Sequence, residues 1–187
     1  GMSQIKTLDL SGFNMENVEQ IPWAFQNCTS LEEIKGMETW TLGKVVRAID
    51  MFKNCNSLNF IDLSNSSLPS SANTNGMFSM SADATDEAKE LFVVTSDAKI
   101  MSYNFKSSNR TAPTLTVDAN GGTFADGETV KTKEYFTVTP EEYKNPEQTI
   151  QKDIENFGEF ANSGYRFKGW EKVTTQSENV GKFNASY

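Results

Sequence analysis

The segment FQNCTSL at residues 25–31 recurs as FKNCNSL at residues 52–58, an offset of 27 residues. The register continues on both sides of this segment, and the copy that contains Ile34 and Met37 has one extra residue, Gly36, which we interpret as a one-residue bulge. Three sets of apolar residues align at spacings of 26 or 27: Leu8, Ile34 and Ile61; Leu10, Met37 and Leu63; Phe25, Phe52 and Phe78. A period of this length indicates stacked repeats, in which each unit buries its apolar face only against its neighbours.

A short alternating run opens two of these units, LDLS at residues 8–11 and IDLS at residues 61–64. Alternation in a strand places the leucine and isoleucine side chains inward and the aspartate outward. Stacked copies then predict a parallel sheet with Asp9, Lys35 and Asp62 in one exposed row, about 4.8 Å per step. We take these three residues as the candidate binding site.

The second copy carries a longer pattern, MFxxCxSLxxIDLS, over residues 51–64. This pattern resembles the BspA-like leucine-rich-repeat surface proteins of bacteria, and the resemblance covers residues 5–80. From Ser79 the pattern degenerates, which is typical of a last repeat that closes the stack. The resemblance implies a leucine-rich-repeat solenoid and a protein exposed at the cell surface.

A polar segment at residues 104–113, ending in Pro113, interrupts the repeat register and predicts a domain boundary. Residues 114–118 alternate as a strand, and the Asn-Gly-Gly turn at 120–122 predicts a tight hairpin. Apolar residues at helical spacing predict a helix over 146–157. Residues 182–187 predict a last strand.

Three motifs in this second part resemble one known module: VDANGGTF at 117–124, GYRFKGW at 164–170 and FNASY at 183–187. The module is the Listeria–Bacteroides repeat, also called the internalin B-type repeat, and the match covers residues 114–187. The resemblance implies a small β-grasp-like domain. This family occurs in secreted, wall-linked or lipid-anchored bacterial proteins, often behind leucine-rich repeats.

The expected fold class is therefore α+β and mostly β. A short leucine-rich-repeat-type parallel β solenoid is expected over residues 1–106, followed by the β-grasp-like domain over 112–187. We expect a monomer that is extracellular or at the cell surface. No run of about 20 apolar residues predicts a transmembrane segment, and no signal peptide is visible. Gly1 before Met2 resembles the remnant of a cleaved tag.

Composition excludes several partners and several kinds of catalytic site. The 187 residues include 17 basic and 25 acidic side chains, which give a formal charge of −8, and no histidine. Nucleic acid is an unexpected partner, because neutralising phosphates requires a clustered positive surface. The missing histidine removes the usual general base, a common zinc ligand and the ordinary catalytic triad. We therefore expect no catalytic residues, no metal and no cofactor.

Several residues leave alternatives open. Cys28 and Cys55 occupy equivalent repeat positions, where they are either a disulfide or a pair of buried, inert thiols. Asp118 and Asp126 flank a turn, and are either calcium ligands or solvated loop acids. Trp170 either stacks on a sugar or packs a small core.

The acidic residues of the predicted helical region have two possible roles. Glu141 and Glu142 together with the acids of residues 153–159 could form a glycosidase pair, which requires two carboxylates about 5–9 Å apart in a cleft. The alternative is a capped helix with a solvated acidic face.

The predicted function is a non-enzymatic bacterial protein, at the cell surface or secreted. It would mediate adhesion or protein–protein interaction through the face that carries Asp9, Lys35 and Asp62. The alternatives are a structural spacer or stalk module and a glycan-binding module. The expected partner is a protein or glycan on a host or neighbouring cell. Because the row is mostly acidic, a basic protein patch or a cation-bridged glycan suits it best.

Overall fold

The computed structural model describes residues 4–173 and 181–186, and the chain forms two compact units. Unit 1 contains Gly1–Ala112 and Phe136–Pro140, and unit 2 contains Pro113–Tyr135 and Glu141–Tyr187. Residues 136–140 thus belong to unit 1, although they follow the polar boundary segment at 104–113. A boundary drawn at one point of the sequence does not reveal a later segment that returns to the first unit.

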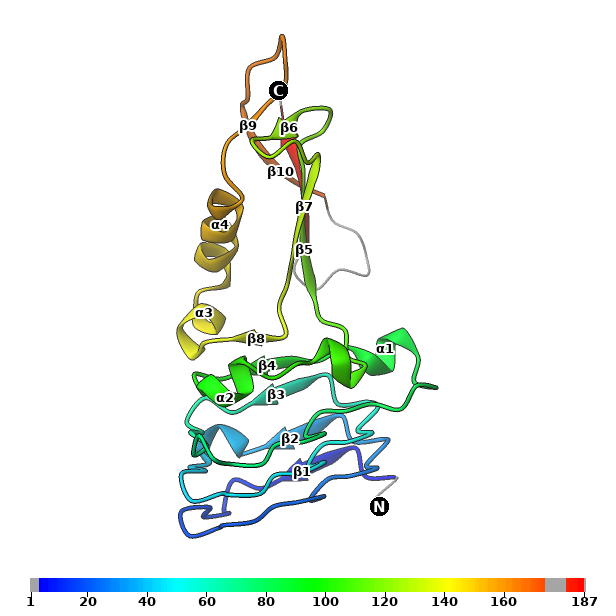
Figure 1. The fold of residues 1–187 in the computed structure, drawn as a ribbon, viewed down its shortest axis with the longest axis vertical. Helices are drawn as coiled ribbons and strands as arrows, with labels where there is room; N and C mark the ends of the chain where they lie inside the picture. The colour runs from blue at the N-terminus through cyan, green and yellow to red at the C-terminus, as the bar shows by residue number, and fades with distance from the viewer. Residues whose placement is uncertain (1–3, 174–180, 187) are drawn as a thin grey trace. The chain divides into compact units, whose positions relative to one another are not determined.

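The described part of unit 1 consists of short strands and single helical turns joined by loops (Figure 1). The strands are β1 (Thr7–Asp9), β2 (Glu33–Lys35), β3 (Phe60–Asp62), β4 (Phe92–Val94) and β8 (Thr137–Val138). The helical elements are η1 (Met37–Thr39), α1 (Asp86–Lys89), α2 (Ala98–Met101) and η2 (Lys106–Ser108). Strands β1 and β2 form one parallel sheet, and β3, β4 and β8 form another in that order.

Phenylalanine rings at the repeat period build the core of unit 1. Phe52 is fully buried and stacks on Phe25 at 5.3 Å and on Phe78 at 5.6 Å between ring centroids. The column continues through Phe105 at 5.3 Å to Phe136 at 5.1 Å. Stacked aromatic rings contribute free energy beyond the area they bury, so this column ties segments far apart in sequence into one core.

Backbone hydrogen bonds hold successive copies in register alongside this column. The Phe25 amide donates to the Met51 carbonyl at 2.9 Å, and the Phe52 amide donates to the Met77 carbonyl at 2.8 Å. The six repeat residues expected to point inward do face the core. Met37, Ile61 and Leu63 are buried, whereas Leu8, Leu10 and Ile34 are half-buried and pack against the core.

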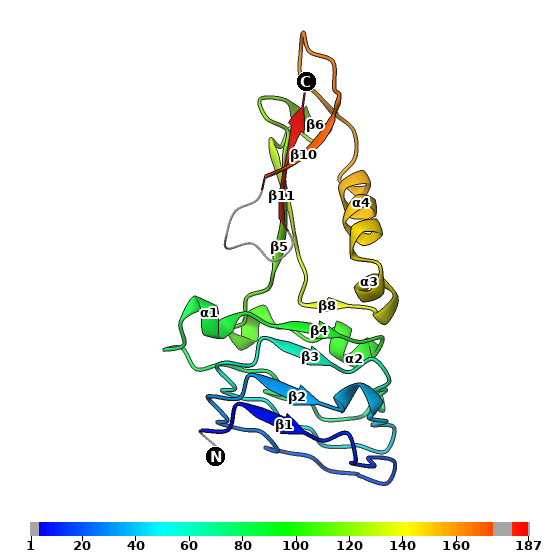
Figure 2. The same ribbon diagram turned by 180° about the vertical axis from the view of Figure 1, so that it is seen from behind.

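Unit 2 combines strands and helices, best followed in the reverse view (Figure 2). Its strands are β5 (Thr114–Asp118), β6 (Thr123–Phe124), β7 (Val130–Glu134), β9 (Phe160–Ala161), β10 (Gly169–Val173) and β11 (Gly181–Ser186). Its helices are α3 (Pro140–Lys144), which begins at the last residue of unit 1, and α4 (Pro146–Asn156). One sheet has the order β10-β11-β5-β7, with β11 parallel to β5 and the other pairs antiparallel, and β6 pairs antiparallel with β9.

Two local predictions for unit 2 are confirmed. Helix α4 covers Pro146–Asn156, where the sequence predicts 146–157, and Gly158 follows it at a φ of 88°. Proline at the first turn and glycine after the last turn are the usual helix boundaries. Strand β11 ends at Ser186, and Tyr187, the last residue of the predicted strand 182–187, lies outside the described residues.

The hairpin predicted at residues 120–122 is wrong in its pairing. The turn itself forms, because Asn120 and Gly121 adopt φ angles of 47° and 90° and the Gly122 amide donates to the Ala119 carbonyl. However, β5 before the turn pairs with β7, and β6 after the turn pairs with β9. Turn chemistry is local, whereas the choice of strand partner depends on distant residues.

The predicted fold class, a leucine-rich-repeat-type parallel β solenoid followed by a β-grasp-like domain, is wrong. The described strands form four small separate sheets, of which two are parallel, one is antiparallel and one is mixed. Within the described residues no backbone ladder joins β2 to β3, and Gly36, with a φ of 89°, turns the chain into η1 directly after β2. Repeated apolar positions predict which residues are buried, but they do not guarantee that each short strand pairs with the next copy.

Candidate functional site

The three candidate binding residues are the last residues of three successive strands. Asp9 ends β1, Lys35 ends β2 and Asp62 ends β3. Asp9 and Lys35 are direct partners in the β1–β2 pair, and Lys35 and Asp62 line the same groove. The structure therefore brings all three predicted residues together on one face of unit 1.

The groove is lined by residues of both β2 and β3, the two strands that no backbone ladder joins within the described chain. Its volume is about 420 Å³. The lining residues are Ser11, Glu32, Glu33, Ile34, Lys35, Gly36, Glu38, Phe60 and Asp62. A hollow of this size accommodates one or two side chains of a partner.

The two aspartates of the row also stabilise the turns that follow their strands. Asp9 Oδ1 accepts hydrogen bonds from the Ser11 amide at 3.0 Å and the Ser11 hydroxyl at 2.7 Å. Asp62 Oδ1 accepts in the same way from the amide and hydroxyl of Ser64. The bonds from Ser11, aided by the charge of Lys35, hold the pKa of Asp9 below its ordinary value. Substitutions that test binding at these positions must keep an acceptor at Oδ1.

Carboxylates dominate the charge of the groove. Four lining side chains are acidic (Glu32, Glu33, Glu38 and Asp62) and one is basic (Lys35). Lys35 Nζ lies 3.7 Å from Glu33 Oε2, and Lys6 Nζ, from outside the groove, lies 2.7 Å from Glu32 Oε1. Both pairs are exposed, so each contributes little and exchanges readily with another cation.

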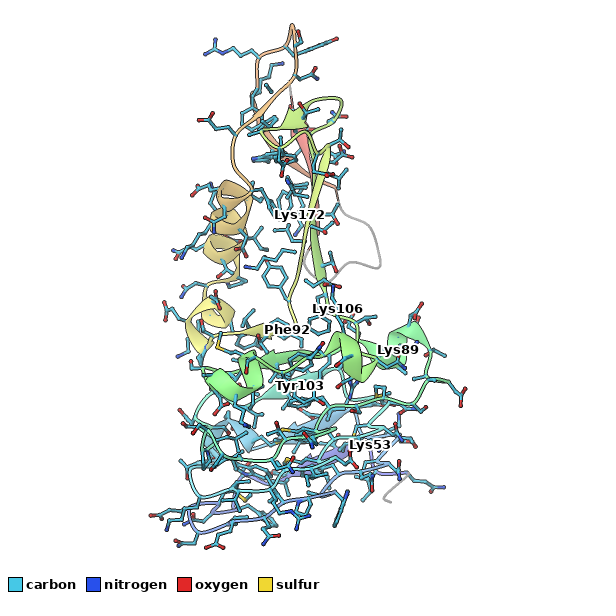
Figure 3. All side chains as sticks on the ribbon, viewed as in Figure 1. Lys53, Lys89, Phe92, Tyr103, Lys106 and Lys172 are labelled. Carbon is cyan, nitrogen blue, oxygen red and sulfur yellow. The ribbon has the colours of Figure 1, made fainter. Side chains whose placement is uncertain are left out.

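Sequence reasoning missed the aromatic part of this face. Phe60 lines the groove with 38% of its surface exposed, and it stacks on its strand partner Phe92 at 6.0 Å between ring centroids, with planes 22° apart. Figure 3 labels Phe92 on β4. Strand alternation does predict the position of Phe60, because residue 60 lies two positions before Asp62 and so faces the same side of the strand.

A family comparison covers most of unit 1 and the start of unit 2. Residues 1–117 match the family described as "Mycoplasma protein of unknown function, DUF285". The chain belongs to this family. No curated protein and no solved structure matches it. Because the description of DUF285 assigns no function, the chemistry of this DUF285 chain has to be read from its residues.

The two aspartates weighed as calcium ligands in the DUF285 chain form turn contacts. Asp118 accepts a hydrogen bond from the Asn120 amide at 2.7 Å. Asp126 accepts one from the Glu128 amide at 3.2 Å and forms an ion pair with Lys131, which holds the pKa of Asp126 below its ordinary value. Within residues 4–173 and 181–186, no three His, Cys, Asp or Glu side chains gather as a metal-binding group.

The acids weighed as a glycosidase pair are engaged in contacts within unit 2. Asp153 is buried and accepts hydrogen bonds from Lys133 Nζ and the Tyr135 hydroxyl, both at 2.6 Å. Burial, together with the bond to Asp153, raises the pKa of Tyr135. Glu141 accepts a bond from Asn145 Nδ2 at 2.8 Å. These contacts favour a structural role for both carboxylates.

Trp170 lies in an aromatic cluster of unit 2. Its ring centroid is 4.7 Å from Phe160, 5.4 Å from Phe167 and 6.4 Å from Phe124, and the side chain is half-buried. These contacts favour the core alternative over a sugar-stacking role.

The cysteines are free, buried thiols. Cys28 is 2% exposed and Cys55 is 0% exposed, and the Cys55 thiol donates to the Phe25 carbonyl at 3.0 Å. Burial raises the pKa of Cys55 to about 12. The structure thus has the inert thiols rather than the disulfide, since the thiolate is the reactive form.

Membrane insertion through a helix finds no support in the described part of the DUF285 chain. None of its helices is long and apolar enough to span a bilayer.

Proposed function

We propose that this chain is a non-enzymatic bacterial protein, at the cell surface or secreted, that mediates adhesion or protein–protein interaction. The interaction face is the one that carries Asp9, Lys35 and Asp62. The observation that carries the proposal is that Lys35 and Asp62 line one groove with an exposed aromatic residue, Phe60, and that Asp9 is the strand partner of Lys35. Exposed aromatic residues are enriched in recognition surfaces, and charged groups beside them steer a partner of complementary charge.

Sequence resemblance supports the location. Residues 51–64 resemble the repeat of BspA-like surface proteins, and residues 114–187 resemble the Listeria–Bacteroides repeat. Both families occur in exported bacterial proteins, which makes an extracellular or surface location the natural setting for an adhesive face.

The charge of the chain and of its groove sets the partner class. The formal charge of the chain is −8, and the groove lining has four acids to one base. A protein with a basic patch, or a glycan bridged by a cation, on a host or neighbouring cell complements this face, whereas nucleic acid does not. Binding should weaken as salt rises, because screening reduces attraction between exposed charges.

The proposal that the chain is not an enzyme rests on the chemistry of its candidate acid and base side chains. The chain has no histidine. Asp153 and Glu141, two of the acids considered for a glycosidase pair, are held by local hydrogen bonds. A general base must reach a substrate proton and have its pKa tuned near the working pH.

The experiment is a binding array of extracellular-matrix proteins, basic proteins and bacterial and host glycans, probed with the full chain. The test variant is Asp9→Asn with Asp62→Asn, which removes two charges but keeps the Oδ1 acceptor for each serine turn. The matched control is Glu16→Gln with Glu19→Gln, which removes two exposed charges away from the groove.

The proposal predicts hits that the test variant weakens and the control retains. Hits that survive the test variant would place the binding face elsewhere. An array with no hits would favour the structural spacer, and hits confined to glycans would favour the glycan-binding module. Turnover on an esterase, protease or glycosidase panel would contradict the non-enzymatic assignment.

A further inference from the structure

We infer that the groove lined by β2 and β3 receives an arginine side chain from a basic segment of the partner protein. The inference rests on the proposed function and names the chemistry of its partner. It is carried by three features of the same hollow: the charge of its lining, an exposed aromatic ring and its volume.

The lining offers acceptors for a cation. The Glu38 carboxylate has no hydrogen-bond or ion-pair partner within the described part of the chain, although its backbone carbonyl accepts from Asn65 Nδ2 at 2.7 Å. Asp62 uses Oδ1 for the Ser64 turn. Carboxylates only accept hydrogen bonds, so the occupant must bring donors and positive charge.

The lysines at the groove do not neutralise it. Lys35 lies 3.7 Å from Glu33, with both side chains more than half exposed, and Lys6 pairs with Glu32 in a similar setting. An incoming guanidinium can share or replace these weak exposed pairs. An anionic ligand would meet four carboxylates, which disfavours phosphate, sulfate and acidic peptides.

Phe60 supplies a surface for the flat part of the ligand. Phe60 is 38% exposed and lines the groove, and the ring of Phe92 on β4 stacks on it. Guanidinium groups stack on aromatic rings through cation–π attraction. Neither the carboxylates nor the ring alone would define the occupant, but together they match a planar cation.

Arginine suits this combination better than lysine. Its guanidinium is planar, presents five donors in a fixed fork and is more weakly hydrated than an ammonium group. The hollow of about 420 Å³ has room for the guanidinium and its aliphatic stem against Ile34 and Phe60. A neutral sugar is disfavoured, because it lacks the positive charge that would pair with four carboxylates. Binding of a neutral glycan is one outcome of the test.

The probes are three fluorescein-labelled peptides, GRGRGRG, its lysine counterpart and its citrulline counterpart, measured by fluorescence anisotropy with the full chain. Citrulline keeps the shape of arginine and removes its charge. We expect the arginine peptide to bind about tenfold more tightly than the citrulline peptide, because charge-assisted hydrogen bonds are lost. It should bind more tightly than the lysine peptide, and raising salt should weaken it.

Two variants locate the site. Glu38→Gln with Asp62→Asn should weaken the arginine peptide about tenfold, and Phe60→Leu, which keeps an apolar side chain, about threefold. The control Glu16→Gln with Glu19→Gln removes equal charge elsewhere and should change binding less than twofold. Circular dichroism and urea unfolding confirm that each variant folds.

Equal weakening by the control would mean diffuse attraction to an acidic protein and would overturn the inference. Equal binding of the arginine and citrulline peptides would overturn it as well, and so would stronger binding of a neutral glycan to the same face. If array partners bind normally to the Glu38→Gln/Asp62→Asn variant, the groove inference fails while the proposed function stands. If the arginine peptide binds as expected but the array yields no partner, the proposed function fails instead.

Discussion

Replacing Phe52 by alanine tests the aromatic column that holds unit 1 together. Phe52 is 0% exposed and sits between Phe25 at 5.3 Å and Phe78 at 5.6 Å. Truncating a buried phenylalanine costs about 3–5 kcal/mol through lost burial and the cavity that remains. Because both ring faces lose a stacked partner, we expect a value near the middle of that range, about 4 kcal/mol.

The matched control is Phe13→Ala, since Phe13 is 61% exposed. A surface substitution of this kind should change the free energy of unfolding by less than about 0.5 kcal/mol. The contrast separates the effect of the column from a general effect of removing an aromatic ring.

The assay is urea unfolding of the full chain followed by tryptophan fluorescence. Trp40 is buried and lies 6.4 Å from Phe25, the ring next to Phe52, so its emission reports on the column. A Trp170→Phe background removes the tryptophan of unit 2 and keeps an aromatic side chain there. A loss below about 1 kcal/mol for Phe52→Ala would refute the view that these rings form a continuous core.

Three further predictions concern a turn, a thiol and a buried acid. Gly36→Ala should destabilise unit 1 by about 1–3 kcal/mol in urea unfolding, because a Cβ at a φ of 89° would collide with the Ser11 backbone. The free energy of unfolding should fall as pH rises from about 9 to about 12, because burial raises the pKa of Cys55 to about 12 and the thiol ionises first in the unfolded chain. In Cys55→Ala, urea unfolding across this pH range should lack the decrease that comes from this thiol. Asp153→Asn should cost unit 2 about 1–3 kcal/mol and Tyr135→Phe about 1 kcal/mol, and a double-mutant cycle by thermal unfolding should show that the two effects are coupled.

The column shows how far the repeat period predicts structure. Phe25, Phe52 and Phe78 align by spacing alone, and they stack. Phe105 lies a further 27 residues on but is hidden in the sequence, because the motif around it has degenerated. Phe136 breaks the period and joins the column from beyond the boundary segment, so only the folded chain reveals it.

The candidate site was predictable in part for a related reason. The repeat aligns Leu8 with Ile34, and in a parallel pair the next residues, Asp9 and Lys35, are then partners as well. The groove beside them was not predictable, since it depends on β2 and β3 lacking a ladder in the described chain, with Gly36 at a left-handed φ after β2. Phe60 lies in the row two residues before Asp62, which the charged positions do not mark.

The sheets were predicted least well. Alternation identifies most strand segments, but strands of two or three residues have too few neighbours to specify pairing from sequence. The wrong solenoid and the wrong hairpin at 120–122 share this cause. Helix α4 was predictable because its caps and its apolar spacing lie within one continuous segment.

Hydrogen exchange of the full chain, with and without saturating GRGRGRG peptide, tests the central claim most directly. If the groove is the binding site, amides in residues 32–38 and 60–64 should exchange more slowly with the peptide bound, and the described amides of unit 2 should not change. The citrulline peptide at the same concentration should give no protection. Protection confined to unit 2, or none at a concentration where anisotropy shows saturation, would contradict the assignment of the groove as the binding site.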